Sequence, residues 1–257
     1  MNLQQQYTAF STILIKETLR FMRIWVQTIV PAAITTGLYF VIFGNLIGSQ
    51  IGDIQGQSYV DYIVPGIILM SIINNAYANV VSSFYSHKFQ HNVEEMLVSP
   101  MPNYIILAGF VSGGVIRGLM VGFVVTLVSI FFTDLQFQNM FITVAVVILT
   151  AILFSLAGFI NAVYANSFDD ISIIPTFVLT PLTYLGGIFF SIDMLSGFWQ
   201  DIAYANPILY MINAMRYGML GISDINIVTA FAIIVAFIVA LYTFCIYLMR
   251  KGVGIRS

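Results

Sequence analysis

The sequence comprises 257 residues, of which 60% are hydrophobic and 8% are charged, with a formal net charge of −2. Soluble domains carry about 25% charged residues because water must solvate their surface, so this composition excludes a soluble globular protein. It predicts a single all-helical membrane domain over residues 1–257, and the small net charge argues against a nucleic-acid partner.

Residues 1–23 are predicted to form an amphipathic helix. Leu3, Tyr7, Phe10, Leu14 and Phe21 recur at helical spacing, while polar and charged residues occupy the other faces. A helix of this design lies along the inner surface of a membrane. The alternative is a loosely ordered tail.

Six segments are apolar and long enough to cross a bilayer, which takes about 20 residues. They are residues 25–47, 59–83, 104–132, 140–164, 171–192 and 227–249. A further apolar segment, residues 194–221, has Asp201 and the Asn206-Pro207 pair near its middle. Because a charge at mid-membrane is costly and proline interrupts the helical hydrogen bonds, this segment is not expected to cross.

Basic residues at both ends of the chain predict its orientation. Lys16, Arg20 and Arg23 precede the first apolar segment, and Arg250, Lys251 and Arg256 follow the last. Lys and Arg remain on the cytoplasmic side, so both ends are expected inside the cell, which requires an even number of crossings. Six crossings satisfy this rule. Residues 194–221 are then expected to form two re-entrant helices that enter the outer leaflet and return.

The loop after the second span, residues 87–103, is predicted to hold a short amphipathic helix. Its apolar strip consists of Phe89, Val93, Met96 and Leu97, and Glu94 and Glu95 lie on other faces. Pro100 and Pro102 end the helix. Such a helix suits docking into the groove of a partner protein, and an interfacial helix without a partner fits the residues equally well.

Polar residues inside two spans mark a second candidate site. Ser71, Asn75, Asn79, Ser82 and Ser86 share one face of the second span, and Thr176, Thr180, Thr183 and Tyr184 form a stripe on the fifth. Polar side chains in hydrocarbon need partners, so these stripes either join helices or line a translocation path. Ser71, Asn75, Asn79, Thr180 and Tyr184 are the candidates for such a path.

Arg117 lies about 13 residues into the third span, roughly 20 Å along its axis. An arginine at this depth is a functional candidate. The structural alternative is an anchor bonded to backbone carbonyls or to a polar residue of the second span.

Motifs for catalysis or nucleotide binding are missing from the sequence. There is no phosphate-binding loop of the G-x-x-x-x-G-K-[ST] type, and the His87–His91 pair has Lys88 where a zincin has its glutamate. The chain is therefore not expected to be an enzyme, and no catalytic, cofactor-binding or metal-ligating residue is predicted.

Three stretches resemble one known family. The most specific begins with Pro181-Leu-Thr-Tyr-Leu-Gly-Gly-Ile-Phe-Phe, continues through Asn206-Pro207-Ile-Leu-Tyr210 and ends at Arg216. The second is Asn92-Val-Glu-Glu-Met-Leu-Val-Ser-Pro100, and the third is Lys16-Glu-Thr-Leu-Arg20. Over nearly its whole length the chain resembles a permease subunit of the type 2 ABC exporters, which handle drugs, lipids and polysaccharides. One departure is Ser196, where many members have proline.

The resemblance implies a role for each segment and a set of partners. Residues 87–103 would contain the coupling helix that receives motion from an ATPase, through Phe89, Val93, Glu94, Glu95, Met96 and Leu97. Asn206, Pro207 and Arg216 would belong to the re-entrant pair. Two copies of the chain would pair in a bacterial inner membrane above two ABC ATPase subunits, which would bind the ATP and Mg²⁺, and the transported substrate stays open.

Two other classes of protein remain as alternatives. A self-contained secondary transporter or channel often has internal repeats and acidic or histidine residues inside its spans, and neither is seen here. An intramembrane enzyme is disfavoured by the missing catalytic residues.

Overall fold

The structure is a computed structural model that describes residues 1–252 and 254 and is all-helical, with no β-strand among these residues. Arg256 lies outside the described residues. The helices in chain order are α1 (Leu3–Arg23), α2 (Trp25–Thr28), α3 (Val30–Tyr39), the π-helix η1 (Phe40–Ile47), α4 (Gly48–Ile51), α5 (Tyr59–Phe89), α6 (Asn92–Val98), α7 (Asn103–Ser129), α8 (Met140–Tyr164), α9 (Asp170–Ile174), the π-helix η2 (Pro175–Leu179), α10 (Thr180–Tyr184), the 3₁₀ helix η3 (Ile192–Met194), α11 (Gly197–Tyr204), α12 (Pro207–Leu220) and α13 (Ile227–Lys251).

Five helical segments among the described residues are long and apolar enough to cross a membrane. They are Trp25–Gly44, Tyr59–Phe89, Asn103–Ser129, Met140–Tyr164 and Ile227–Lys251. Each coincides with a predicted span to within a few residues, because an uninterrupted apolar run of this length has no other way to satisfy its backbone in lipid.

The predicted fifth span is shorter in the structure than in the sequence prediction. Its helix consists of α9, η2 and α10, three consecutive pieces of five residues each, and it ends at Tyr184 instead of Ile192. The run extends about 22 Å at 1.5 Å per residue. The helix ends there because Gly187 follows with φ +79°, a backbone conformation that side-chain-bearing residues rarely adopt.

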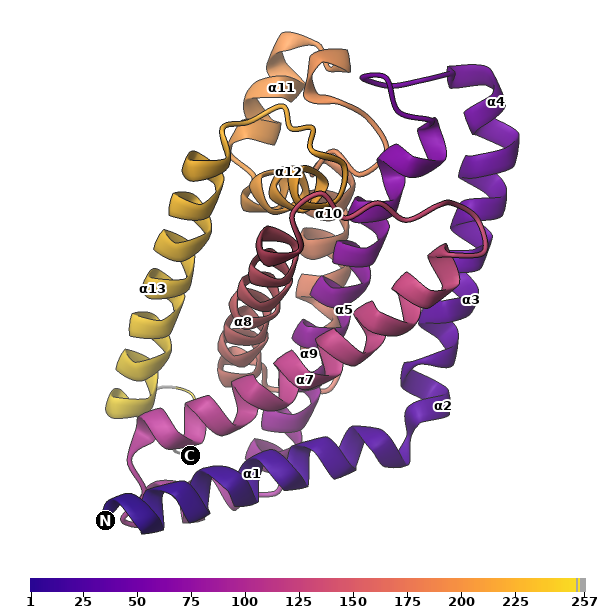
Figure 1. Cartoon of the computed structure of the whole chain (residues 1–257). Helices are drawn as coiled ribbons and strands as arrows, with labels where there is room; N and C mark the ends of the chain where they lie inside the picture. Colours follow the sequence, from indigo (N-terminus) through magenta and orange to yellow (C-terminus); the bar gives the residue numbers. More distant parts are fainter. Residues whose placement is uncertain (253, 255–257) are drawn as a thin grey trace.

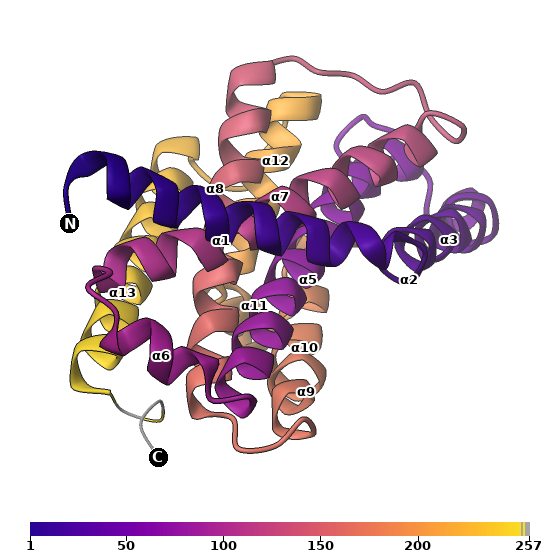
Figure 2. The same ribbon diagram turned by 90° about the horizontal axis from the view of Figure 1, so that it is seen from below.

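Helix α1 lies across one end of the bundle (Figures 1 and 2), at a steep angle to α8 and α13 (Figure 1). An Asn2–Gln5 capping box starts the helix over the predicted residues. It approaches α7 closely because Gly109 and Gly113 have no side chain. A Cβ at these positions would lie 2.6 Å from Ile13 and 2.7 Å from Glu17.

A second glycine row on α7 faces α5. A Cβ on Gly114, Gly118 or Gly122 would come within 3.1 Å of side-chain atoms on α5, such as those of Ile72 and Ala76. Small residues four apart allow close backbone contact between membrane helices. This spacing is visible in the sequence and accounts for the tight packing of α7 between α1 and α5.

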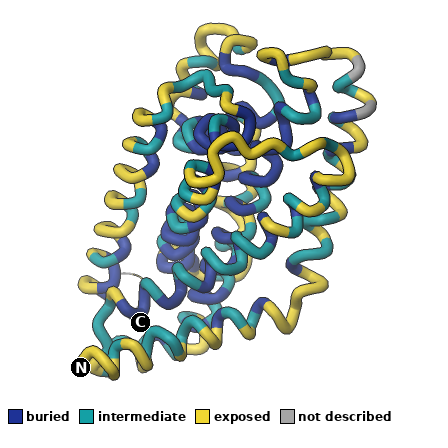
Figure 3. Tube along the Cα trace, viewed as in Figure 1, coloured by how far each residue is buried: buried dark blue, intermediate teal, exposed yellow. Residues whose placement is uncertain are grey.

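The core of the bundle is centred on α5, which is largely buried, and α8, which is partly buried, whereas α13 is largely exposed (Figure 3). Helices α11 and α12 lie at the end of the bundle opposite α1, where the expected pair of short helices within residues 194–221 is found (Figure 1). From there α13 returns to the end at which α1 lies.

Candidate functional site

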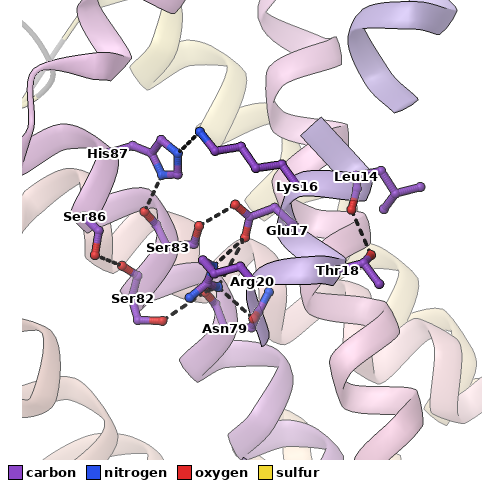
Figure 4. Close-up of polar contacts among 10 residues, drawn as sticks. All are labelled: Leu14, Lys16, Glu17, Thr18, Arg20, Asn79, Ser82, Ser83, Ser86 and His87. Carbon is purple, nitrogen blue, oxygen red and sulfur yellow. Dashed lines mark hydrogen bonds and ion pairs between the residues drawn. The ribbon is translucent and has the colours of Figure 1, made fainter. Parts of the chain in front are cut away.

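Side chains of α1 and α5 meet in a polar contact that we call the α1–α5 junction (Figure 4). Its members are Lys16, Glu17 and Arg20 of α1 and Asn79, Ser83 and His87 of α5. The three α5 residues are four apart, so they share one face of the helix.

Glu17 is the buried centre of the junction, with 1% of its surface exposed. Its carboxylate accepts a hydrogen bond from the Ser83 hydroxyl at 2.7 Å and from Arg20 Nη2 at 3.2 Å. Arg20 Nη2 also donates to the Asn79 side-chain oxygen at 2.8 Å. A buried carboxylate requires a positive partner and hydrogen bonds, and these contacts provide both while fastening α1 to α5.

Lys16 and His87 form the second half of the junction. His87 Nδ1 lies 2.8 Å from the Ser83 carbonyl, and His87 Nε2 lies 3.0 Å from Lys16 Nζ. A carbonyl can only accept, so Nδ1 carries a proton and donates it. In this tautomer Nε2 is an acceptor, so Lys16 Nζ donates to it.

The predicted polar stripe of α5 is divided between two environments. Asn79 is fully buried beneath α1, whereas Ser71 and Asn75 are half-buried further along the helix. Arg117 Nη2 donates to the Asn75 side-chain oxygen at 3.2 Å, so the intramembrane arginine has the expected partner on the second span.

Thr180 and Tyr184, the path candidates on the fifth predicted span, are both exposed. The Thr180 hydroxyl donates to the carbonyl of Pro175 on its own helix, and the Tyr184 hydroxyl lies 3.3 Å from that of Tyr39. The five path candidates therefore do not form one cluster within a single chain.

At the opposite end of the bundle, residues far apart in the sequence form what we call the Arg216 cluster, consisting of Tyr62, Gly187, Arg216 and Asp224. Arg216 is fully buried and donates from Nη2 to the Gly187 carbonyl at 2.7 Å. Its guanidinium lies 3.9 Å from the centre of the Tyr62 ring, and Nη1 lies 3.9 Å from the Asp224 carboxylate. The arginine thus holds the turn that ends α10.

Asn206 joins the end of α10 to the start of α12. Its side-chain nitrogen donates to the Leu182 carbonyl at 2.6 Å, and its side-chain oxygen accepts from the Ile208 backbone at 3.0 Å. Pro207 is the first residue of α12, a position where the missing N–H is of no consequence. The Asn-Pro pair therefore acts as a two-sided helix cap.

The predicted apolar strip of residues 87–103 is partly buried within the chain and partly exposed. Val93 is 1% exposed and belongs to the core of the chain, and Met96 and Leu97 pack partly against that core. Phe89 is 63% exposed and Val98, at the end of the helix, is 88% exposed. Helix α6 is thus seated by Val93 and exposes Val98, while Phe89, the last residue of α5, is exposed with its ring centre 5.3 Å from that of Phe168.

Glu94 and Glu95 lie in the first turn of α6, Glu95 exposed and Glu94 half-buried. Just before them, Lys88 Nζ donates to the carbonyls of Val163 and Ala165, both at 2.7 Å, at the end of α8. The end of α5, just before α6 begins, is therefore tied to the end of α8.

Comparison with known proteins decides the family. The model of the ABC-2 type transporter family matches residues 8–220. The chain belongs to this family. The resemblance seen in the sequence motifs is confirmed, and members of the family generally work with ABC ATPase partners.

The inner membrane transport permease YadH of Escherichia coli K12 is 57% identical over 251 residues, covering 98% of each chain. Nodulation protein J of Rhizobium leguminosarum bv. viciae is 23% identical over 215 residues, covering 83% of each chain. This ABC-2 chain is accordingly a multi-pass transport permease of a bacterial inner membrane, a transport subunit and not a catalytic enzyme.

The α1–α5 junction was not predicted from the sequence of this ABC-2 permease. Glu17 lies among charged and polar residues of an amphipathic helix, where a solvated position is expected. The available signal was the glycine pair Gly109 and Gly113, which indicates that some helix packs closely on α7, although it does not say which one.

Proposed function

We propose that this ABC-2 permease is the membrane-spanning subunit of an ATP-driven exporter and works as a homodimer with two separate ATPase subunits. ATP and its Mg²⁺ would bind those partner subunits and not this chain. The observation that carries the proposal is that α6 is seated on the chain by Val93 and exposes Val98, with Phe89 exposed just before it at the end of α5. A short helix with exposed apolar side chains on and beside it suits a groove in a partner.

The seating of α6 supports a role as a coupling helix. Because Lys88 ties the preceding turn to the end of α8 and Val93 packs into the core, a displacement of α6 would move α5 and α8 with it. Closure of the ATPase subunits would in this way switch the path between inward and outward access, as in other rigid-body transitions. Glu94 and Glu95 would face basic groups at the rim of the ATPase groove.

Six crossings with both ends in the cytoplasm are supported by the course of the chain. Helix α13 ends where α1 lies (Figure 1), and Lys16, Arg20, Arg23, Arg250 and Lys251 all belong to these two helices. An even number of crossings then requires the run of residues 170–184 as the sixth. Its length of about 22 Å is less than the ~30 Å of a bilayer core, so the turn at Gly186 and Gly187 would lie within the outer leaflet beside the re-entrant α11 and α12.

A second copy would cover the polar face that one chain leaves open. Thr176, Thr180 and Tyr184 are exposed on the fifth predicted span, and Asn74 is exposed on α5. Hydroxyl and amide groups facing lipid are costly. We therefore place the translocation path along this face, with Ser71, Asn75, Thr180 and Tyr184 near the two-fold axis. Asn79 would reach the path only if α1 moved.

The test is association with the ATPase encoded for this permease. Phe89→Ala with Val98→Ala removes two exposed apolar side chains, each worth about 1.5–3 kcal/mol when buried in a partner, and should weaken co-purification by at least tenfold. The control is Leu3→Ala with Tyr7→Ala, which removes side chains on α1 that are 85% and 72% exposed. Equal retention of the ATPase by both double variants, or transport that persists without ATP, would contradict the proposal.

A further inference from the structure

A groove lies between α7 and α13, and α13 is largely exposed along its length (Figure 3). Its lower part, about 640 Å³, lies where α7 begins and α13 ends. Its upper part, about 350 Å³, continues between α7, α8 and α13. Tyr242 lines both parts, so they adjoin along α13.

The upper part is lined by aliphatic side chains. Its wall includes Val111 and Val115 of α7, Ile152 of α8 and Ile238 of α13. Since α13 is an apolar helix with little of its surface buried in the chain, this part faces the lipid. Its chemistry and elongated course suit one acyl chain.

The lower part combines a basic residue with aromatic side chains. Arg250 is exposed at its edge, and Tyr104, Tyr242 and Tyr247 line it. Lys251 Nζ lies 5.4 Å from the centre of the Tyr247 ring, which adds a second positive charge nearby. No acidic residue is among the described residues that line either part. Cations with tyrosines at the end of a transmembrane helix are typical of the membrane interface, and basic pockets between such helices bind anionic headgroups.

We propose that this groove binds an anionic phospholipid of the cytoplasmic leaflet, with its phosphate against Arg250 and one acyl chain along Val111 and Val115. The leaflet follows from the orientation in the proposed function, but the binding itself does not depend on an ATPase or on transport. A lipid is favoured over a protein occupant because the positive end and the apolar end of the groove match the two ends of one phospholipid.

Native mass spectrometry of the purified permease tests this with equal amounts of phosphatidylglycerol and phosphatidylcholine that carry the same acyl chains. We expect preferential retention of phosphatidylglycerol. Arg250→Gln should lower the ratio of the two bound lipids about fivefold, the effect of one basic residue at an anionic surface, and Arg250→Lys should keep most of the preference. Arg23→Gln, which removes an exposed basic residue at the end of α1, is the matched control and should leave the ratio unchanged.

Two further measurements test the acyl-chain part of the groove and distinguish a bound phospholipid from free phosphate. Ser112→Phe fills the upper part of the groove and should lower retention of both lipids without changing their ratio. Millimolar inorganic phosphate should not displace the lipid. Equal retention of the two lipids by the unsubstituted protein, or an unchanged ratio in Arg250→Gln, would overturn the proposal. Displacement by phosphate, or lipid retention unaffected by Ser112→Phe, would overturn the acyl-chain site.

Discussion

The α1–α5 junction and the Arg216 cluster are buried charged contacts at opposite ends of the bundle, and they differ in what they hold. In the junction, Glu17 and Arg20 link two helices mainly through side chains, and Arg20 keeps 30% of its side chain exposed. In the cluster, Arg216 is fully buried and bonds the carbonyl of a turn, while two of its nitrogens, Nε and Nη1, have no hydrogen-bond partner in the described part of the chain.

This difference indicates which contact can be released. If the junction opened, Arg20 could turn toward water, and its guanidinium would be solvated at modest cost. If Arg216 left its site, the Gly187 carbonyl and the Asp224 carboxylate would stay buried without it. The junction is therefore suited to a contact that changes during a transport cycle, and the cluster to one that stays closed.

The largest effect is expected when Arg216 is removed from its cluster. Arg216→Met should lower the free energy of unfolding by about 3–5 kcal/mol, because it leaves a buried carboxylate without its positive partner. Thermal unfolding of the detergent-purified protein, followed by size-exclusion chromatography, is the measurement. Adding Asp224→Asn removes the unpaired charge and should recover part of the loss. If Arg216→Met unfolds at the same temperature as the unsubstituted protein, the Arg216 cluster does not contribute this free energy of unfolding.

An intermediate effect is expected at the junction. Glu17→Ala removes the acceptor of the Ser83 and Arg20 hydrogen bonds, and should cost about 2–3 kcal/mol, since bonds to charged groups are each worth roughly 1.5–3 kcal/mol and Arg20 can be rehydrated. Glu17→Gln keeps an acceptor for Ser83 and should cost less. The same unfolding measurement ranks the two sites, and a larger loss for Glu17→Ala than for Arg216→Met would reverse the comparison.

The smallest effect concerns the approach of α1 to α7. Gly113→Ala places a Cβ 2.7 Å from the Glu17 side chain, and such overpacking typically costs about 1–3 kcal/mol. We expect the lower end of this range because α1 lies at the edge of the bundle and can shift. Gly37→Ala is the matched control, since a Cβ there meets nothing within 4 Å and alanine favours a helix by up to about 1 kcal/mol. Equal unfolding temperatures for the two variants would mean that close packing does not hold α1 in place.

Much of the fold could be predicted from the sequence because hydropathy is a property of a segment. The predicted spans at residues 59–83 and 227–249 coincide with α5 and α13, since a long apolar run in lipid forms a helix whatever its neighbours are. The fifth predicted span, residues 171–192, extends too far at its C-terminal end for the same reason. Apolar residues continue past Gly187 to Ile192, but the backbone at Gly187 leaves the helical region, which hydropathy does not register.

The candidate sites were predictable to different degrees. The motif at Asn206 and Arg216 could be recognised from residue identities and spacing, yet its contacts with Leu182 and Gly187 are made across a turn whose geometry the sequence does not specify. Val93 was expected to dock into a partner with the rest of its strip. The helical period of α6 defines a face, and only the position of the neighbouring helices decides whether that face is covered.

The sequence by itself determined the membrane environment, the helical class, most of the spans and the ABC-2 family, because each follows from local composition or from a short motif. The tertiary structure alone decided that Glu17 is buried and that Asn79 is covered. Glu17 and Ser83 are 66 positions apart, and whether a charged side chain can leave water depends on a partner that another helix supplies. The residue type fixes which bonds a side chain can form, and the packing of the helices decides whether that side chain is exposed to water or buried.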